Sequence, residues 1–228
     1  MEEGALPPVN RIQHNLLARS ERRLIDWLCP RMPAWVTPDR LTMLGLLGAA
    51  VTCLGTAMTV VERDWIWLGI AGYLLNWFGD SLDGSLARFR RIERPRFGYF
   101  IDHSTDALAI ALIAAGFGVS PWVRADIALL TLGAYYMLAI HTFLAARVVS
   151  DFRLSYLNAG PTEMRIALIA LSLWMYHDRP GGDVTVRLPQ AEVFSQFDLV
   201  LGALAAILIV LFVLQTLSTA RQLSKTNF

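Results

Sequence analysis

The chain has 228 residues, a formal net charge of only +1, and 55% hydrophobic residues. This composition is too apolar for an ordinary soluble domain and indicates a membrane protein. No nucleic-acid-binding motif is present, so we expect the basic clusters to face lipid headgroups and expect no nucleic-acid partner. The two cysteines, Cys29 and Cys53, are far apart and indicate neither a disulfide framework nor a zinc site.

The N-terminal region is polar and precedes the first apolar span. Residues 1–10 are expected to form a tail. From Arg11 to about Pro30, apolar residues recur at helical spacing among several arginines and Trp27. This pattern favours an amphipathic helix lying on the membrane surface, and a helix that caps the loops is a second interpretation. We therefore expect residues 1–36 to be a tail and juxtamembrane helix, and residues 37–228 to form one membrane domain.

The first span opens with a helix-start signal. Thr37 is a capping residue, Pro38 suits the first helical position, and Asp39 places an acid in the first turn. Leu41–Val61 then supplies 21 mostly apolar residues, enough to cross a bilayer. Small side chains along this span predict close contact with another helix, at Gly45, Gly48, Ala49, Thr52 and Gly55.

Five further apolar segments follow. They cover about residues 65–88, 97–119, 125–147, 161–176 and 197–220, with a polar loop at 177–196 before the last. Because only helices or closed barrels satisfy backbone polar groups in lipid, runs of this length predict helices. The predicted fold class is all-α: a six-transmembrane-helix bundle with an N-terminal amphipathic interfacial helix.

Basic residues are distributed unevenly between the two sides of these spans. Sixteen of the 20 lysines and arginines fall on the side that carries both termini. The other four are Arg63, Arg124, Arg179 and Arg187. The positive-inside rule therefore predicts an integral membrane protein with both termini in the cytoplasm.

Four carboxylates lie at the ends of two apolar segments, where bare charge is energetically expensive. Asp80 and Asp83 share one helix face, and Asp102 and Asp106 share another. The basic segment between the pairs contains Pro95, which indicates a turn between two antiparallel helices. Carboxylates facing each other in this way offer hard oxygen ligands for one or two Mg²⁺, Mn²⁺ or Ca²⁺ ions, near the cytoplasmic face.

This stretch resembles the signature of the CDP-alcohol phosphotransferase family, Asp-x-x-Asp-Gly-x-x-Ala-Arg, a spacer, and Gly-x-x-x-Asp-x-x-x-Asp. Every fixed position is filled, in order by Asp80, Asp83, Gly84, Ala87, Arg88, Gly98, Asp102 and Asp106. The spacer has nine residues where eight is usual, and Asp39 stands where Asn is more common. The resemblance covers about residues 37–165.

The resemblance implies an enzyme of phospholipid synthesis that transfers a phospho-alcohol group from a CDP-alcohol to an alcohol acceptor and releases CMP. It implies that Asp80, Asp83 and Asp102 bind Mg²⁺ or Mn²⁺, with two ions expected. Asp106 would act as the general base or bind the second ion. The small residues Gly84, Ala87 and Gly98 would leave room for the nucleotide, and Arg88 would contact its phosphates. Family members are commonly homodimers, and the small-residue faces would allow such contact.

Two branches of the family remain open. His103 and Gly160-Pro161-Thr162-Glu163 resemble the aminoalcohol branch, which joins CDP-choline or CDP-ethanolamine to diacylglycerol. The short six-span form resembles the prokaryotic enzymes, which mostly use CDP-diacylglycerol with a polar alcohol. We therefore expect CDP-diacylglycerol as donor and a prokaryotic cytoplasmic membrane as location.

Several roles stay open on the residues alone. His103 could relay a proton beside Asp106 or orient Asp102. Arg147, Arg153 and Arg165 could bind an acceptor phosphate or serve as topology signals.

Three other classes of protein have acidic residues within membrane spans or share a membrane fold of this kind. They are an ion or proton transporter, a prenyltransferase, and a non-catalytic membrane scaffold. Asn76-x-x-x-Asp80 is faintly similar to the prenyltransferase motif, but six spans are too few for that fold. The complete eight-position pattern favours the transferase.

Overall fold

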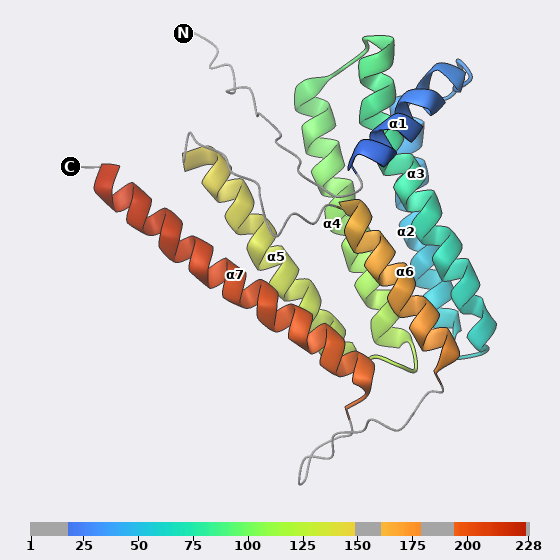
Figure 1. The fold of residues 1–228 in the computed structure, drawn as a ribbon, viewed down its shortest axis with the longest axis vertical. Helices are drawn as coiled ribbons and strands as arrows, with labels where there is room; N and C mark the ends of the chain where they lie inside the picture. Colours follow the sequence, from blue (N-terminus) through green and yellow to red (C-terminus); the bar gives the residue numbers. More distant parts are fainter. Residues whose placement is uncertain (1–17, 149–160, 179–193, 227–228) are drawn as a thin grey trace.

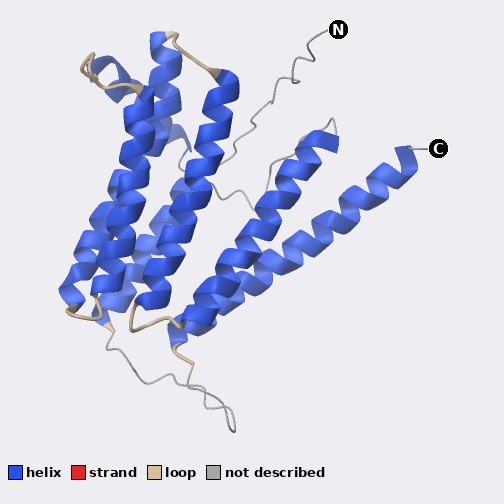
Figure 2. Ribbon diagram, turned by 180° about the vertical axis from the view of Figure 1, so that it is seen from behind, coloured by secondary structure: helices blue, strands red, loops and turns tan. Residues whose placement is uncertain are grey.

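The computed structural model describes residues 18–148, 161–178 and 194–226, and all regular elements in these ranges are helical (Figures 1 and 2). Two short 3₁₀ turns, η1 and η2, cover Cys29–Arg31 and Arg63–Trp65. The α-helices are α1 (Ala18–Leu28), α2 (Pro38–Met58), α3 (Ile66–Arg90), α4 (Pro95–Val119), α5 (Ala125–Val148), α6 (Pro161–His177) and α7 (Gln196–Thr226).

The start of α2 confirms the predicted helix-start signal. Thr37 Oγ1 accepts a hydrogen bond from the Arg40 backbone N–H at 3.3 Å, and Pro38 occupies the first turn. The predicted spans match α2 to α7 within a few residues, and the largest difference is at α7, which continues to Thr226.

Four of the described helices are long and apolar enough to cross a membrane, namely α2, α4, α5 as far as Ala146, and α7 as far as Lys225. Of the other two long helices, α3 contains Asn76, Asp80 and Asp83, which lower its hydropathy, and α6 has only 17 residues. The apolar helices define an integral membrane protein, while the number of helices that cross the bilayer stays a prediction.

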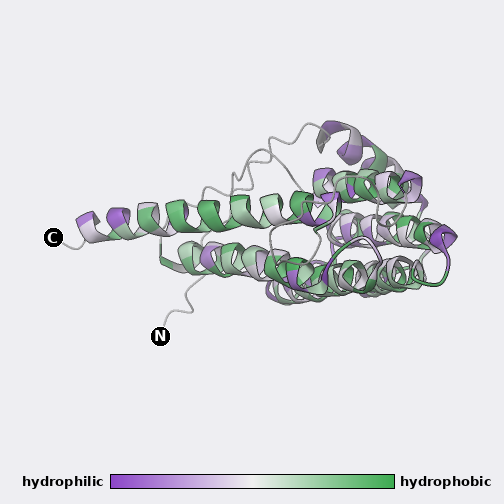
Figure 3. Cartoon of the chain, turned by 90° about the horizontal axis from the view of Figure 1, so that it is seen from below, coloured by the Kyte–Doolittle hydropathy of each residue, from purple (hydrophilic) through white to green (hydrophobic). Residues whose placement is uncertain are grey.

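The helices form a bundle from which one pair diverges. α2 contacts both α3 and α4, and α6 lies against α3. α5 and α7 lie side by side and lean away from the other helices, as Figures 1 and 3 show. Apolar residues cover most of α7, whereas hydrophilic residues gather on α1 (Figure 3).

The small-residue face of α2 is packed against α3. A Cβ atom on Gly48 would lie 2.3 Å from the Asn76 backbone nitrogen, and one on Gly79 would lie 2.3 Å from the Gly45 nitrogen. The two backbones are therefore in contact, which only glycine permits. Because α3 covers this face, it cannot serve the homodimer that the sequence suggested, and homodimerisation stays a prediction without this support.

Two apolar clusters hold the described helices together at opposite ends. The first cluster holds five helices together, α3, α4, α5, α6 and α7, near the α2–α3 and α4–α5 turns. It consists of Ile66, Phe117, Trp122, Val123, Ala128, Leu171, Met175, Phe197 and Leu201. The second joins α1 to the other end of α2 and α3, through Ile25, Cys29, Val36, Leu41, Leu82 and Leu86.

α1 is docked on the bundle through this second cluster. Its arginines Arg19, Arg22 and Arg23 are exposed, as are Leu24 and Trp27. α1 therefore packs as a cap and at the same time presents a basic, partly apolar outer face. The predicted helix began at Arg11, and residues 11–17 lie outside the described ranges.

Candidate active site

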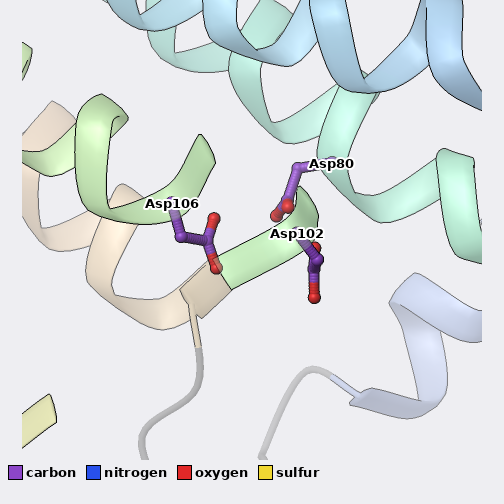
Figure 4. A group of neighbouring side chains, drawn as sticks. All are labelled: Asp80, Asp102 and Asp106. Atoms are coloured by element: carbon purple, nitrogen blue, oxygen red, sulfur yellow. The ribbon is translucent and has the colours of Figure 1, made fainter. Parts of the chain in front are cut away.

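Three of the four predicted carboxylates come together between α3 and α4. One oxygen atom from each of Asp80, Asp102 and Asp106 lies within 4.8 Å of the other two, and all three side chains are half-buried. Figure 4 shows Asp80 extending from α3 beside the two aspartates of α4. The spacing of four residues places Asp102 and Asp106 one turn apart on the same face.

The fourth carboxylate, Asp83, is turned towards α2. Its Oδ2 accepts a hydrogen bond from Thr42 Oγ1 at 2.6 Å, and its Oδ1 accepts one from the Gly84 backbone N–H at 2.5 Å. Asp83 is therefore one turn from Asp80 on α3 but outside the three-oxygen group. Thr42 is a neighbour of the site that the motif alone did not indicate.

Arg165 brings a cation from α6 to the aspartates. Its Nη2 lies 2.6 Å from Asp80 Oδ2, and its Nε donates to Asn76 Oδ1 at 2.8 Å. The Arg165 side chain is only 12% exposed, and its Nη1 has no hydrogen-bond partner among the described residues. A topology signal would not need this burial, so Arg165 belongs to the surroundings of the site. Arg153 and the Arg147 side chain lie outside the described residues.

Asn76 connects three helices at the same point. Its Nδ2 donates to the Gly45 carbonyl of α2 at 2.9 Å, while its Oδ1 accepts from Arg165 of α6. The sequence pattern did not predict Asn76 at this site. The one available signal was its position one turn before Asp80 on a helix face that was already acidic.

His103 is held beside Asp102 mainly by aromatic rings. Its Nδ1 lies 3.4 Å from Asp102 Oδ2, longer than an ordinary hydrogen bond. Its ring centre is 4.3 Å from that of Tyr99 and 5.2 Å from that of Phe143. Both predicted roles, proton relay and orientation of Asp102, remain compatible with this position.

The predicted nucleotide-binding positions on α3 and α4 are open. A Cβ on Gly98 would meet nothing within 4 Å, and one on Gly84 would meet only the Arg88 side chain, at 3.4 Å. Packing among the described residues therefore does not require glycine at either position, in contrast to the α2–α3 contact. Ala87 is half-buried, and Arg88 is exposed with its Nη2 bonded to Ser85 Oγ at 3.1 Å.

Two arginines near the α3–α4 turn have structural partners. Arg94 pairs with Asp39 at the start of α2. Arg90 donates to three backbone carbonyls that precede α2, those of Met32, Pro33 and Val36. This basic turn therefore fastens the segment between α1 and α2 as well as carrying positive charge.

The acidic group fits a divalent cation by its charge and ligand type. Within the described ranges, Arg165 pairs with Asp80 alone, and no arginine or lysine lies within ion-pair distance of Asp83, Asp102 or Asp106. Buried charges are normally paired or bound to metal, and carboxylate oxygens are the ligands that Mg²⁺ and Mn²⁺ prefer.

These features define an integral membrane protein with an acidic cluster between two of its helices. The family model for CDP-alcohol phosphatidyltransferase matches residues 35–214, which is most of the chain. The chain belongs to this family. The family uses CDP-alcohol donors and alcohol acceptors in membranes and is generally dependent on divalent metal.

Individual relatives match shorter segments. The chain is 30% identical over 122 residues to cholinephosphotransferase 1 of Gallus gallus, covering 47% of this chain and 36% of that protein. It is 35% identical over 83 residues to phosphatidylinositol phosphate synthase of Cutibacterium acnes, covering 36% and 38%. It is 34% identical over 106 residues to archaetidylinositol phosphate synthase of Pyrococcus horikoshii, covering 46% and 52%. The matched segments thus span about a third to a half of the length of these relatives.

Proposed function

We propose that this protein is a metal-dependent transferase of phospholipid synthesis. It moves a phospho-alcohol group from a CDP-alcohol to an alcohol acceptor and releases CMP. The observation that carries the proposal is the three-aspartate group of α3 and α4, in a chain that belongs to the CDP-alcohol phosphatidyltransferase family. The complete eight-position pattern, in which every aspartate is present, argues against a transporter or a non-catalytic scaffold.

Asp80, Asp102 and Asp106 would hold the cation, Mg²⁺ or Mn²⁺, and Asp83 would join them for a second ion. When bound, the metal neutralises the negative charge of the donor's diphosphate. Arg165 holds Asp80 from the α6 side through its 2.6 Å ion pair. This pairing orients the Asp80 carboxylate before any ligand arrives.

Asp106 is the proposed general base. It accepts the proton of the acceptor hydroxyl as the acceptor oxygen bonds to the phosphorus of the transferred group. The bond from that phosphorus to the CMP oxygen breaks, and CMP leaves with the electron pair. Gly84, Ala87 and Gly98 leave space for the nucleotide, and the exposed Arg88 contacts its phosphates.

The proposed donor is CDP-diacylglycerol, with a polar alcohol as acceptor. Support comes from the relatives named phosphatidylinositol phosphate synthase and archaetidylinositol phosphate synthase. A second candidate is an aminoalcohol phosphotransferase that acts on diacylglycerol. It is favoured by His103 directly after Asp102 and by the relative named cholinephosphotransferase 1.

We further propose that α2 to α7 all cross the bilayer within one domain, residues 37–228, with both termini and the acidic group at the cytoplasmic side. α1 would lie at that surface, with Arg19, Arg22 and Arg23 towards lipid headgroups. A prokaryotic cytoplasmic membrane and a homodimer complete the proposal.

The proposed function is tested by assaying CMP release from purified protein in lipid with Mg²⁺ or Mn²⁺. CDP-diacylglycerol, CDP-choline and CDP-ethanolamine are supplied separately, each with a panel of acceptors. We expect metal-dependent CMP release from CDP-diacylglycerol. Release only from the other two donors with diacylglycerol would establish the second candidate, and no release from any donor by folded protein would overturn the proposal.

A further inference from the structure

Glu21 of α1 connects α3 and α6 by hydrogen bonds at the end of the bundle that carries the three-aspartate group, which is here called the site end. It is the second such polar junction, after the one made by Arg165. Its Oε1 accepts hydrogen bonds from Trp77 Nε1 at 2.9 Å, from Ser81 Oγ at 2.9 Å and from Thr162 Oγ1 at 2.8 Å. The donors belong to α3 and α6 and are all neutral. None of the arginines and lysines whose side chains are described forms an ion pair with Glu21, and a half-buried carboxylate without such a pair needs donors to replace the water it has lost.

This junction lies beside the Arg165 junction in register. On α3, Trp77 and Ser81 directly follow Asn76 and Asp80, the two residues that Arg165 contacts. On α6, Thr162 precedes Arg165 by three residues, about one helical turn. Glu21 and Arg165 therefore bridge the same two helices at neighbouring positions.

These two polar bridges join the first turns of α6 to α1 and α3. The buried apolar contacts of α6 lie in its later half, where Leu171 and Met175 join the cluster at the opposite end of the bundle. In its first two turns, Thr162 and Arg165 make hydrogen bonds to other helices. Hydrogen bonds in a low-dielectric region strengthen one another, so loss of one member of the network weakens the others.

We propose that Glu21 is a positioning residue for the transfer reaction. By holding Thr162 against α3, it fixes the first turn of α6 and so keeps Arg165 against Asp80. α1 is then part of the frame of the site, in addition to any role at the membrane surface. This inference rests on the proposed function, because the residue that Glu21 positions is a proposed metal ligand.

The expected effect follows from the sensitivity of transfer reactions to geometry. A displacement of about 1 Å in a reacting group can lower a rate by roughly 100-fold. Glu21→Ala removes the acceptor for all three hydrogen bonds, so we expect kcat for CMP release to fall about tenfold or more while the donor KM changes less than about twofold. Glu21→Gln keeps a carbonyl oxygen, which has two lone pairs and can accept two of the three bonds, so we expect it to retain clearly more activity than Glu21→Ala.

Two further variants separate positioning from a general loss of stability. Thr162→Val removes one partner of Glu21, and the double variant with Glu21→Ala should be no slower than Glu21→Ala alone, because both changes break one junction. Asp26→Ala removes an exposed acid of the same helix and should keep wild-type kinetics. Wild-type kcat in Glu21→Ala, or effects of the two changes that multiply, would overturn the proposal.

Hydrogen exchange provides a readout that does not depend on activity. In Glu21→Ala, amides of residues 165–168 should exchange faster than in wild type or Asp26→Ala, because the first turn of α6 is released. If Glu21→Ala does not fold, Thr162→Val carries the same test, with lower kcat and faster exchange expected. Unchanged exchange and unchanged kcat in an active protein would overturn this inference alone. An inactive wild-type protein would instead count against the proposed function, whatever the exchange shows.

Discussion

The four carboxylates of the site differ in the group that each of them faces, and this group determines what each carboxylate can do. Asp80 faces the Arg165 guanidinium, whereas Asp83 faces the Thr42 hydroxyl and a backbone N–H. Asp102 and Asp106 are left without an arginine or lysine partner in the described part of the chain. This difference in surroundings makes the last two the carboxylates with the greatest need of a cation.

Asp83→Asn tests whether the fourth carboxylate takes part in metal binding. The asparagine oxygen can still accept from the Gly84 N–H, and its amide nitrogen, in place of the other oxygen, can donate to the Thr42 hydroxyl. The fold should therefore be intact, while loss of the charge lowers CMP release about 100-fold or more. Activity is measured together with the thermal unfolding midpoint. As a matched control, Thr42→Val removes the hydroxyl but keeps the Asp83 charge, and a loss of roughly tenfold is expected. Near-normal turnover in Asp83→Asn would remove Asp83 from the metal site.

The sequence predicted those site residues that lie close together along the chain, and it did not predict contacts between distant residues. Asp80, Asp102 and Asp106 were predicted because fixed spacing on two neighbouring helices determines their faces. Arg165 is 85 residues from Asp80, and Glu21 is 141 residues from Thr162. Their contacts depend on how α6 and α1 pack against the other helices, and the spacing of residues within one helix does not predict this.

At the scale of helices, glycines at packed positions and glycines at open positions have different surroundings. Gly48 lies on the α2–α3 contact, where a Cβ would meet backbone at 2.3 Å, whereas Gly98 has nothing within 4 Å. The sequence predicted a small-residue face on α2, but periodicity identifies a face and not its partner. Only the structure shows that α3 fills it.

The two groups predict opposite outcomes for the same substitution. Gly48→Ala should force α2 and α3 apart and destabilise the protein by roughly 1–3 kcal/mol or more. Gly98→Ala should not lower the unfolding midpoint, but a methyl group in the space proposed for the nucleotide should raise the KM for the CDP-alcohol about tenfold. Unfolding midpoints and KM values of both variants check this. An unchanged KM in Gly98→Ala would show that the nucleotide does not approach this position.

At the scale of the whole molecule, the two ends of the bundle differ in charge. α1 and the α3–α4 turn lie at one end, and the α2–α3 and α4–α5 turns at the other (Figure 1). Arginines are concentrated at the first end, whereas Arg63 and Arg124 are the basic residues of the two turns at the second. The helix bounds were predictable within a few residues because long apolar runs define them. The divergence of α5 and α7 was not, because it depends on which side chains pack at each end.

Labelling from one side of the membrane tests the proposed orientation. In a variant whose Cys29 and Cys53 are replaced by alanine, single cysteines are introduced at Arg91, Arg221 and Asp64, all exposed. Intact cells are then treated with a maleimide that cannot cross the membrane. The positive-inside rule predicts labelling of Asp64→Cys alone, with the other two reacting only after the cells are opened. Labelling of Arg91→Cys in intact cells would contradict a cytoplasmic site.

The most direct test of the central claim is whether CMP release requires a divalent cation bound by these aspartates. The protein in lipid vesicles is treated with EDTA, and CMP release from the active CDP-alcohol is measured before and after Mg²⁺ is restored. We expect no release in EDTA, full recovery with Mg²⁺ in the wild type, and no recovery in Asp102→Asn. Undiminished release in EDTA, or wild-type recovery in Asp102→Asn, would contradict it.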